Sequence, residues 1–341
     1  MIINWVQTLI TILIFSSSTV LANDIYVQQV GDLLDMDITQ DGTDNQVEGL
    51  SGSGDASING NNKTLSLTQQ GDNNQYRIWT HGGNQQMSAT TTGNNNISAM
   101  DNHGNNNNMT ISITGSYNET HTEIGNGGDN DNDLTVTIDN GDDNYIYSEV
   151  INGDYNTIDT QIHSQDDGYI KVTVNGNNND IKAWQGKHED GNVDTNETGD
   201  NEVYWIVSGH NNTLESYQTD DNNQGGLHIA NYITGDDNTV KHTQRGGGNH
   251  DGFIEITGDS NDVTLLQRGN SDQQYADIVL DDGHTVDVFQ RYGDHTTNID
   301  LTNGGGGYNL NLDQTASTNQ TYNITGTCTN SNGCGLTVTQ N

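Results

Sequence analysis

The sequence has no proline, two cysteines and only nine lysine and arginine residues, and 29% of its 341 residues are hydrophobic. The shortage of cations argues against a nucleic acid as partner, because neutralising phosphates requires clustered lysine and arginine. The 47 acidic residues give a formal charge of −38, which an anionic membrane surface repels. The low hydrophobic content argues against an ordinary globular domain with a large apolar core.

Low hydrophobicity combined with a high net charge is typical of disordered chains, but the hydrophobic residues here follow a regular pattern. They alternate with polar residues in short runs, such as 65–67, 111–113 and 134–138. Alternation with a period of two indicates a β-strand with one buried face. The sequence therefore predicts an all-β protein rather than a disordered one.

The first 22 residues differ from the rest of the chain. Leu9 to Phe15 is a mostly apolar stretch, and three serines and then Val20-Leu21-Ala22 follow it. This order is typical of a secretory signal peptide, so we predict that residues 1–22 are removed by cleavage after Ala22. The alternative is an N-terminal membrane anchor, although the stretch is short for a membrane span. After cleavage the protein would be secreted, with no insertion into a membrane.

The two cysteines, Cys328 and Cys334, lie close together near the C-terminal end of the sequence. In an exported protein two neighbouring cysteines most often form a disulfide. A metal site is the weaker alternative, because two thiols without a nearby histidine are half of a zinc ligand set. We expect a disulfide that clamps a C-terminal turn.

A repeated unit runs through residues 54–341. Each copy has an alternating strand, a Gly-x-x-Asn segment, and a second alternating strand that often ends in glutamine. The segment occurs, among other places, at Gly71 to Asn74, Gly115 to Asn118, Gly176 to Asn179, Gly209 to Asn212, Gly235 to Asn238 and Gly258 to Asn261. Each of the last four is followed by a glutamine at a fixed spacing, and a variant copy continues the series: Gln185, Gln218, Gln244, Gln267 and Gln290.

In these four copies the glutamine comes six residues after the asparagine, and this even spacing predicts one buried face. Residues at even offsets lie on the same side of a strand, so the asparagine, an aliphatic residue and the glutamine face inward together. Glycine and asparagine suit a tight arc because both tolerate φ > 0. One coil cannot bury its own apolar face, but coils stacked about 4.8 Å apart can. Amides above one another could then bond to each other, which avoids about 1–3 kcal/mol for each unpaired buried group.

We therefore expect an amyloid-like β-solenoid of about eleven stacked strand-arc-strand coils with two facing parallel sheets. Residues 23–53 are less regular, and we expect them to cap the stack or to provide a strand that docks on the next subunit. The looser connections between coils, such as 82–84, 125–133 and 186–191, are rich in Gly, Asn and Asp. We expect all of them on one edge of the stack.

The unit resembles the curlin repeat, which builds the curli-type subunits of bacterial extracellular amyloid fibres. Residues 69–74 are similar to the first half of that repeat, and residues 238–244 and 261–267 are similar to the second half. The first glutamine of the family pattern is usually Ile or Val here, the coils vary in length, and the cysteine pair is not part of the pattern. The resemblance implies a divergent member of the family.

The resemblance also implies a function. A curli-type subunit leaves the cell through a secretion pore, polymerises with itself at the bacterial cell surface, often on a nucleator subunit, and contributes to biofilm matrix and cell adhesion. A second class stays open, namely a monomeric secreted β-solenoid that binds a glycan, an adhesion target or ice. Residues 336–341 form a strand of repeat type without a cap, and exposed edge strands template further pairing. This favours end-to-end growth.

We expect no enzymatic activity, because the acidic residues are spread along the chain and the arginines recur with the repeat rather than at one locus. No cofactor is expected, and calcium is the one metal considered. Asp129, Asp131 and Asp133 resemble a single turn of a calcium-binding nonapeptide repeat, which normally occurs in tandem. We expect the fourteen tyrosines and four tryptophans to stack between coils rather than to bind glycans.

Overall fold

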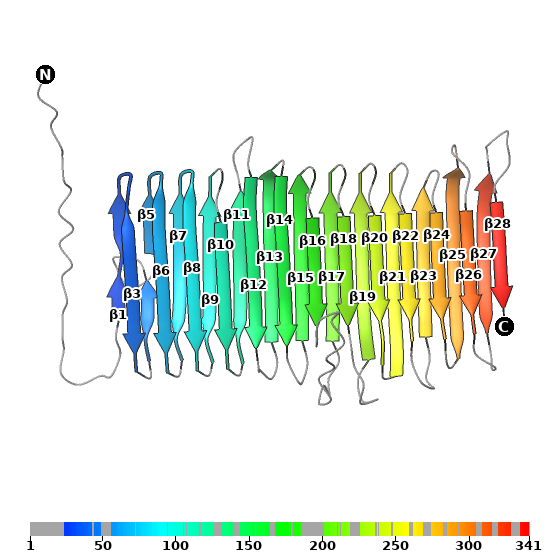
Figure 1. Cartoon of the computed structure of the whole chain (residues 1–341), viewed down its shortest axis with the longest axis horizontal. Coiled ribbons are helices and arrows are strands. Elements are labelled where there is room, and N and C mark those ends of the chain that lie inside the picture. The colour runs from blue at the N-terminus through cyan, green and yellow to red at the C-terminus, as the bar shows by residue number, and fades with distance from the viewer. Residues whose placement is uncertain are drawn as a thin grey trace, which may run out of the picture.

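A computed structural model of the chain shows an all-β solenoid (Figure 1). The described residues contain no helix that is long and apolar enough to cross a membrane. The predicted signal peptide, residues 1–22, lies outside them. The structure describes residues 24–42, 44–48, 56–71, 73–93, 95–104, 106, 108–115, 117–125, 131–139, 144–153, 155–163, 168–176, 178, 180–185, 201–209, 211, 213–218, 226–235, 237, 239–246, 248–258, 262–268, 274–281, 285–291, 294–304, 309–315, 320–328 and 335–340.

Two parallel sheets run the length of the stack, and we name them sheet A and sheet B. Sheet A has fifteen strands: β1 (Asp24–Tyr26), β2 (Gln28–Val30), β4 (Gln46–Glu48), β5 (Ala56–Asn59), β7 (Gln75–His81), β9 (Ile97–His103), β11 (Glu119–Gly125), β13 (Asn144–Gly153), β15 (Gly168–Gly176), β17 (Asn201–Ser208), β19 (Gly226–Thr234), β21 (Gly248–Thr257), β23 (Gln274–Asp281), β25 (His295–Gly304) and β27 (Thr321–Cys328).

Sheet B has thirteen strands: β3 (Asp35–Asp41), β6 (Lys63–Gln70), β8 (Gln85–Thr92), β10 (Asn108–Thr114), β12 (Asp131–Asp139), β14 (Tyr155–His163), β16 (Asp180–Gln185), β18 (Thr213–Gln218), β20 (Thr239–Gln244), β22 (Asp262–Gln267), β24 (Thr285–Gln290), β26 (Asn309–Gln314) and β28 (Gly335–Gln340).

The chain passes from one sheet to the other with each coil, as the alternating arrows of Figure 1 show. Each strand of sheet B closes one coil, so the described residues form thirteen coils, close to the eleven or so that the sequence predicts. Part of the excess comes from residues 23–53, because β3 pairs in parallel with β6, and β4 pairs with β7. This segment contributes coils to the stack, although its strands β1, β2 and β4 are short.

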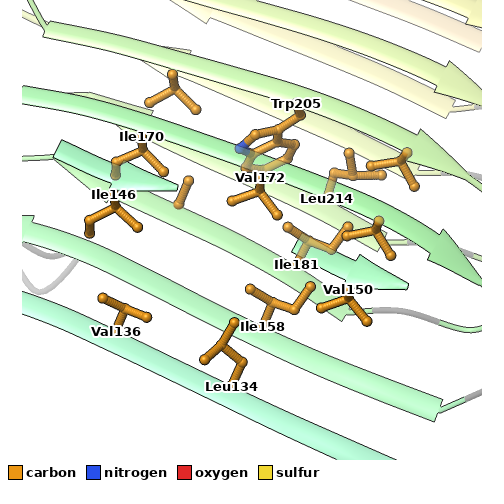
Figure 2. Close-up of a cluster of buried hydrophobic side chains, with 14 of the residues drawn as sticks. Leu134, Val136, Ile146, Val150, Ile158, Ile170, Val172, Ile181, Trp205 and Leu214 are labelled. Carbon is orange, nitrogen blue, oxygen red and sulfur yellow. The ribbon is translucent and has the colours of Figure 1, made fainter. Parts of the chain in front are cut away.

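Parallel pairing places like residues in columns along the stack. Leu65 pairs with Met87, Met87 with Met109, and Met109 with Leu134. The inward faces of both sheets meet in one continuous core of Ile, Val, Leu and Met, part of which Figure 2 shows around Val172. Because every second residue of a strand faces inward, a chain with few hydrophobic residues can still form a continuous buried layer. The prediction of stacked coils with two facing parallel sheets is confirmed.

The connections between coils lie on both edges of the stack, and the prediction of a single edge is wrong. Residues 82–84 join β7 of sheet A to β8 of sheet B, and the segment after β11 likewise leads to sheet B. Residues 186–200 join β16 of sheet B to β17 of sheet A, which is the opposite edge. Strands within each sheet are parallel, so the direction of the crossing fixes the edge.

Candidate functional site

The most distinctive internal feature is a ladder of glutamine side chains at the ends of the sheet B strands β16 to β26. In the first five of its six glutamines, Nε2 donates to the Oε1 of the glutamine in the next coil. The donor–acceptor distances along the ladder are 3.3 Å from Gln185 to Gln218, 3.3 Å to Gln244, 2.6 Å to Gln267, 2.7 Å to Gln290 and 3.0 Å to Gln314. All six side chains are buried. The predicted inward glutamines and their amide-to-amide bonding are both present.

The same amide groups also tie the two sheets together. Gln185 Nε2 donates to the backbone oxygen of Glu202 at 2.8 Å, and Gln218 Nε2 donates to that of His228 at 3.1 Å. Gln267 Nε2 donates to the backbone oxygen of Tyr275 at 3.2 Å. Both hydrogens of such an amide are therefore used, one along the stack and one across it, which removes the cost of burying them.

The ladder is interrupted in the middle of the molecule. In the same column, Gln40 and Gln69 bond at 2.7 Å, and then Thr91, Ile113, Ile138 and Ile162 occupy the position. Because Ile162 precedes Gln185, Gln185 Oε1 has no donor among the described residues. Sequence reasoning missed Gln40 and Gln314, although Gln40 stands before Gly42 much as Gln69 stands before Gly71.

The asparagines of the Gly-x-x-Asn segments bond differently from the prediction. Asn74 Nδ2 donates to the backbone oxygen of Gly71 at 2.9 Å, which closes its own arc. The backbone N–H of Asn74 donates to Asn96 Oδ1 of the next coil at 3.0 Å. Asn118 repeats the bond to its own glycine, Gly115, at 2.7 Å. These buried amides bond to the backbone instead of to each other, because each lies within reach of the carbonyl of the glycine three residues before it.

The Gly-x-x-Asn segments also lie at two different places in the coil. Those that begin at Gly71 and Gly115 lead from sheet B to sheet A, whereas those that begin at Gly176, Gly209, Gly235 and Gly258 lead from sheet A to sheet B. The prediction of one repeated unit aligned these two kinds of arc with each other, and that alignment is wrong. In the first coils both arcs carry the same signal, with left-handed glycines every eleven residues at Gly60, Gly71, Gly82, Gly93, Gly104 and Gly115.

Five of these glycines, all except Gly71, lie directly against the glycine of the preceding coil. A Cβ built on Gly93 would lie 1.7 Å from the backbone oxygen of Gly71, and one built on Gly235 would lie 1.6 Å from that of Gly209. With φ of 142° at Gly93, neither the space nor the backbone accepts a side chain. The left-handed asparagine is the third residue of the segment, such as Asn73 at φ 57°, rather than the fourth.

The exposed third-position asparagines make an outer ladder at the same arcs. Asn95 Nδ2 donates to Asn73 Oδ1 at 3.2 Å, and Asn84 Nδ2 donates to Asn62 Oδ1 at 3.2 Å. Asn211 repeats the contact with Asn178 at 3.1 Å in the later coils. The arcs are therefore stacked by glycine, by backbone and by side-chain amides at once.

Aromatic side chains on the outer face of sheet A stack on one another along the solenoid. The rings of Tyr145 and Tyr169 are 4.8 Å apart and nearly parallel, and those of His121 and Tyr147 are 4.7 Å apart. Lys171 Nζ lies 5.2 Å from the centre of the Tyr147 ring. In these pairs neighbouring rings cover each other's faces, which agrees with the predicted stacking between coils.

The core also contains buried histidines, which the sequence did not reveal. His242 is fully buried, and its Nδ1 lies 3.3 Å from Asn231 Nδ2. Burial, together with the nearby His228 and His250, lowers the pKa of His242 to about 3. The imidazole is therefore neutral in the folded protein near pH 7. Its position in the column, between Ser216 and Leu265, explains why no spacing rule distinguishes it from an ordinary inward residue.

Several predicted residues fall wholly or partly outside the described part of the chain. Cys328 ends β27, and Cys334 lies outside the described residues, so the disulfide stays a prediction. Asp131 and Asp133 lie on β12 instead of in a loop, and Asp129 lies outside. Within the described residues no group of three or more His, Cys, Asp or Glu side chains is arranged to hold a metal ion. Four of the predicted repeat asparagines also lie outside the described residues, namely Asn179, Asn212, Asn238 and Asn261.

Comparison of the chain with protein-family models, with curated proteins and with solved structures finds no match in any of the three.

Proposed function

We propose that the protein is a secreted structural subunit that assembles end to end into extracellular amyloid-like fibres, as the resemblance to curli-type subunits implies. Location at the bacterial cell surface, a nucleator subunit and a secretion pore as partners, and a role in biofilm matrix and adhesion belong to the same proposal. The observation that carries it is the continuous column of inward residues. A coil built on such columns accepts another coil of the same kind on its open side.

The two outermost strands of sheet B in the described residues have matching column residues. β3 places Met36, Ile38 and Gln40 in the three inward columns. The corresponding register positions of β28 are Leu336, Val338 and Gln340. If β28 of one copy pairs with β3 of the next, the aliphatic columns continue across the junction. The glutamine column continues as well, with Gln340 next to Gln40.

Charge also favours this junction. The outward positions of β3 include Asp35, Asp37 and Asp41, which would repel a second row of carboxylates at about 4.8 Å. The residues of β28 that alternate with these register positions are Gly335, Thr337 and Thr339, which carry no charge. In a molecule with a net charge of −38, a junction that brings no carboxylates face to face lowers the barrier to association.

The test is electron microscopy and fibre diffraction of the mature protein at several concentrations. We expect unbranched fibres with a meridional reflection at about 4.7–4.8 Å. A variant with Leu336→Lys and Val338→Lys places two charges in the inward columns of the outermost strand, and it should stay monomeric with an unchanged β-sheet circular dichroism spectrum. Persistent monomers of the unmodified protein, without that reflection, would refute the proposal.

A further inference from the structure

The outer face of sheet B carries an uncharged hydroxyl array over the three coils that contain β6, β8 and β10. The alternation of each strand places four side chains on this face. None of the twelve residues is charged, and nine are serine or threonine, although the whole chain has 47 acidic residues. The hydroxyl array consists of Thr64, Ser66, Thr68, Gln70, Gln86, Ser88, Thr90, Thr92, Asn108, Thr110, Ser112 and Thr114.

The array is regular in two directions. Thr68, Thr90 and Ser112 are register partners in adjacent strands, and so are Ser66, Ser88 and Thr110. Neighbours across the strands are about 4.8 Å apart, and neighbours along a strand about 6.7 Å apart. Both pairings run without a register shift, and successive coils differ by 22 residues. Threonine has a stiff χ1, so its hydroxyl and methyl groups form a fixed two-dimensional lattice.

Strand propensity alone does not account for the array. Threonine suits any outward position of a β-sheet, yet the outer face of sheet A in neighbouring coils carries Arg77, Trp79 and Asp101. The outer face of sheet B in the later coils carries charges as well, for example Glu215 and Lys241. The small uncharged residues are therefore concentrated at one place, on the coils whose spacing is the most regular.

The size and chemistry of the array restrict its ligand. Twelve positions at these spacings cover roughly 400 Å², half of the about 800 Å² that each partner contributes to a stable protein interface. The array offers no charge to an ion and no aromatic ring to a sugar. Eight of its side chains are exposed, and the other four are half-buried. A regular array of small, uncharged hydrogen-bonding groups matches a ligand that is itself a regular lattice of hydrogen-bonding groups.

We propose that the hydroxyl array binds the surface of ice. The hydroxyls donate to and accept from water molecules at fixed positions, while the methyl groups hold the intervening water in cages, so the first water layer over the array is ordered before it meets the crystal. Hydrogen bonds of about 2.75 Å in a tetrahedral lattice place second-neighbour oxygens of ice about 4.5 Å apart, close to the spacing of about 4.8 Å between register partners of the array. The binding does not depend on fibre assembly, because the array lies within one molecule, although a fibre would present one array per subunit.

The test uses the mature protein in an ice-affinity partition assay, in which a slowly growing ice hemisphere takes up bound protein and excludes other solutes. We expect uptake of the unmodified protein and inhibition of ice recrystallisation. Thr90→Tyr places a large ring in the middle of the array and should abolish uptake. Thr90→Val keeps the shape and strand propensity but removes one hydroxyl, and it should reduce uptake.

The matched control is Thr264→Tyr, at an outward position of β22 in the same sheet, whose register partners are Lys241 and Asp287. This control should be taken up like the unmodified protein. Exclusion of the unmodified protein from ice, or equal uptake of the Thr90→Tyr and Thr264→Tyr variants, would overturn the proposal. A third result would also overturn it. If the unmodified protein is not taken up into ice, and Thr90→Tyr but not Thr264→Tyr loses lateral fibre bundling or binding to insoluble cellulose, then the array serves that other ligand.

Discussion

Replacing Gln267 by leucine tests how the glutamine ladder stabilises the solenoid. The change removes the acceptor that Gln244 Nε2 contacts at 2.6 Å and the donor that Gln290 Oε1 contacts at 2.7 Å. Two buried side-chain amides then lack partners, at about 1–3 kcal/mol each, and the Tyr275 backbone oxygen loses the donor at 3.2 Å. The buried leucine offsets part of this loss. We expect the free energy of unfolding of the monomer to fall by about 2–4 kcal/mol.

The double variant Gln267→Leu with Gln290→Leu tests whether the loss of stability depends on the number of glutamines removed or on the number of broken ladder ends. It removes two rungs but again leaves two broken ends, Gln244 Nε2 and Gln314 Oε1, since Gln290 bonds to Gln314 at 3.0 Å. It also removes the donor that Thr297 Oγ1 contacts at 2.6 Å. The expected loss therefore exceeds that of the single variant by the net worth of one hydrogen bond, about 1 kcal/mol, rather than being twice as large. The loss of stability is then set mainly by the number of broken ladder ends and not by the number of glutamines removed. The same column agrees with this, because its apolar residues Ile113, Ile138 and Ile162 follow one another without an isolated glutamine between them.

The assay is urea unfolding of the unassembled mature protein, followed by circular dichroism at fixed pH. Gln161→Leu is the control, because Gln161 occupies an outward, half-buried position on β14, and it should change the unfolding free energy by less than about 0.5 kcal/mol. A double variant that loses twice as much as the single variant would show that each rung acts alone. A single variant that matches the control would show that the ladder contributes no stability.

Three further predictions concern the arcs, the core histidine and the net charge. Gly93→Ala should prevent folding of its coil, with loss of limited-proteolysis protection there, since its Cβ would meet the Gly71 backbone oxygen at 1.7 Å; normal protection would contradict this. The pKa of His242 is lowered to about 3, so its stabilising contribution is complete above pH 6.5 and falls as the pH drops, by about 3 kcal/mol at pH 4.5. His242→Leu should lack that part of the pH dependence, and identical urea profiles of both proteins at pH 7 and 4.5 would refute it. Each subunit carries a formal charge of −38, so whole subunits repel one another, and salt screens this repulsion. Added salt or divalent cations should therefore speed fibre growth in a dye-binding assay, and a rate independent of ionic strength would disprove it.

The glutamine ladder and the two-sheet architecture were predictable because spacing along a strand fixes which face a residue occupies. The spacing from Asn238 to Gln244 is even, and so is that from Asn261 to Gln267, so the inward direction of these glutamines follows from the sequence alone. The bonding of Asn74 to its own arc was not predictable in this way. It depends on the length of the side chain relative to the arc, which the strand period does not contain.

The placement of the arcs was not predictable because two different connections carry one signal. Gly71 and Gly82 begin arcs at opposite edges of the stack, yet each is followed by a left-handed asparagine, at Asn73 and Asn84. A repeat of eleven residues and a repeat of 22 then look alike in sequence. The hydroxyl array was hidden for a related reason, because it appears only when Thr68, Thr90 and Ser112 are aligned across three coils.

The eleven-residue spacing of the stacked glycines limits how genes for such proteins can change in length. Removing or adding 22 residues between Gly60 and Gly115 deletes or inserts one whole coil and leaves every later strand in its own sheet. Removing or adding eleven residues also preserves each arc. In the rest of the chain, however, every strand of sheet A would then lie in sheet B, and every strand of sheet B in sheet A. The outer surface would then switch sides at that point, with hydroxyls and aromatic rings on the same face. Length variation among functional descendants should therefore occur in steps of a full coil, even though half a coil would fold.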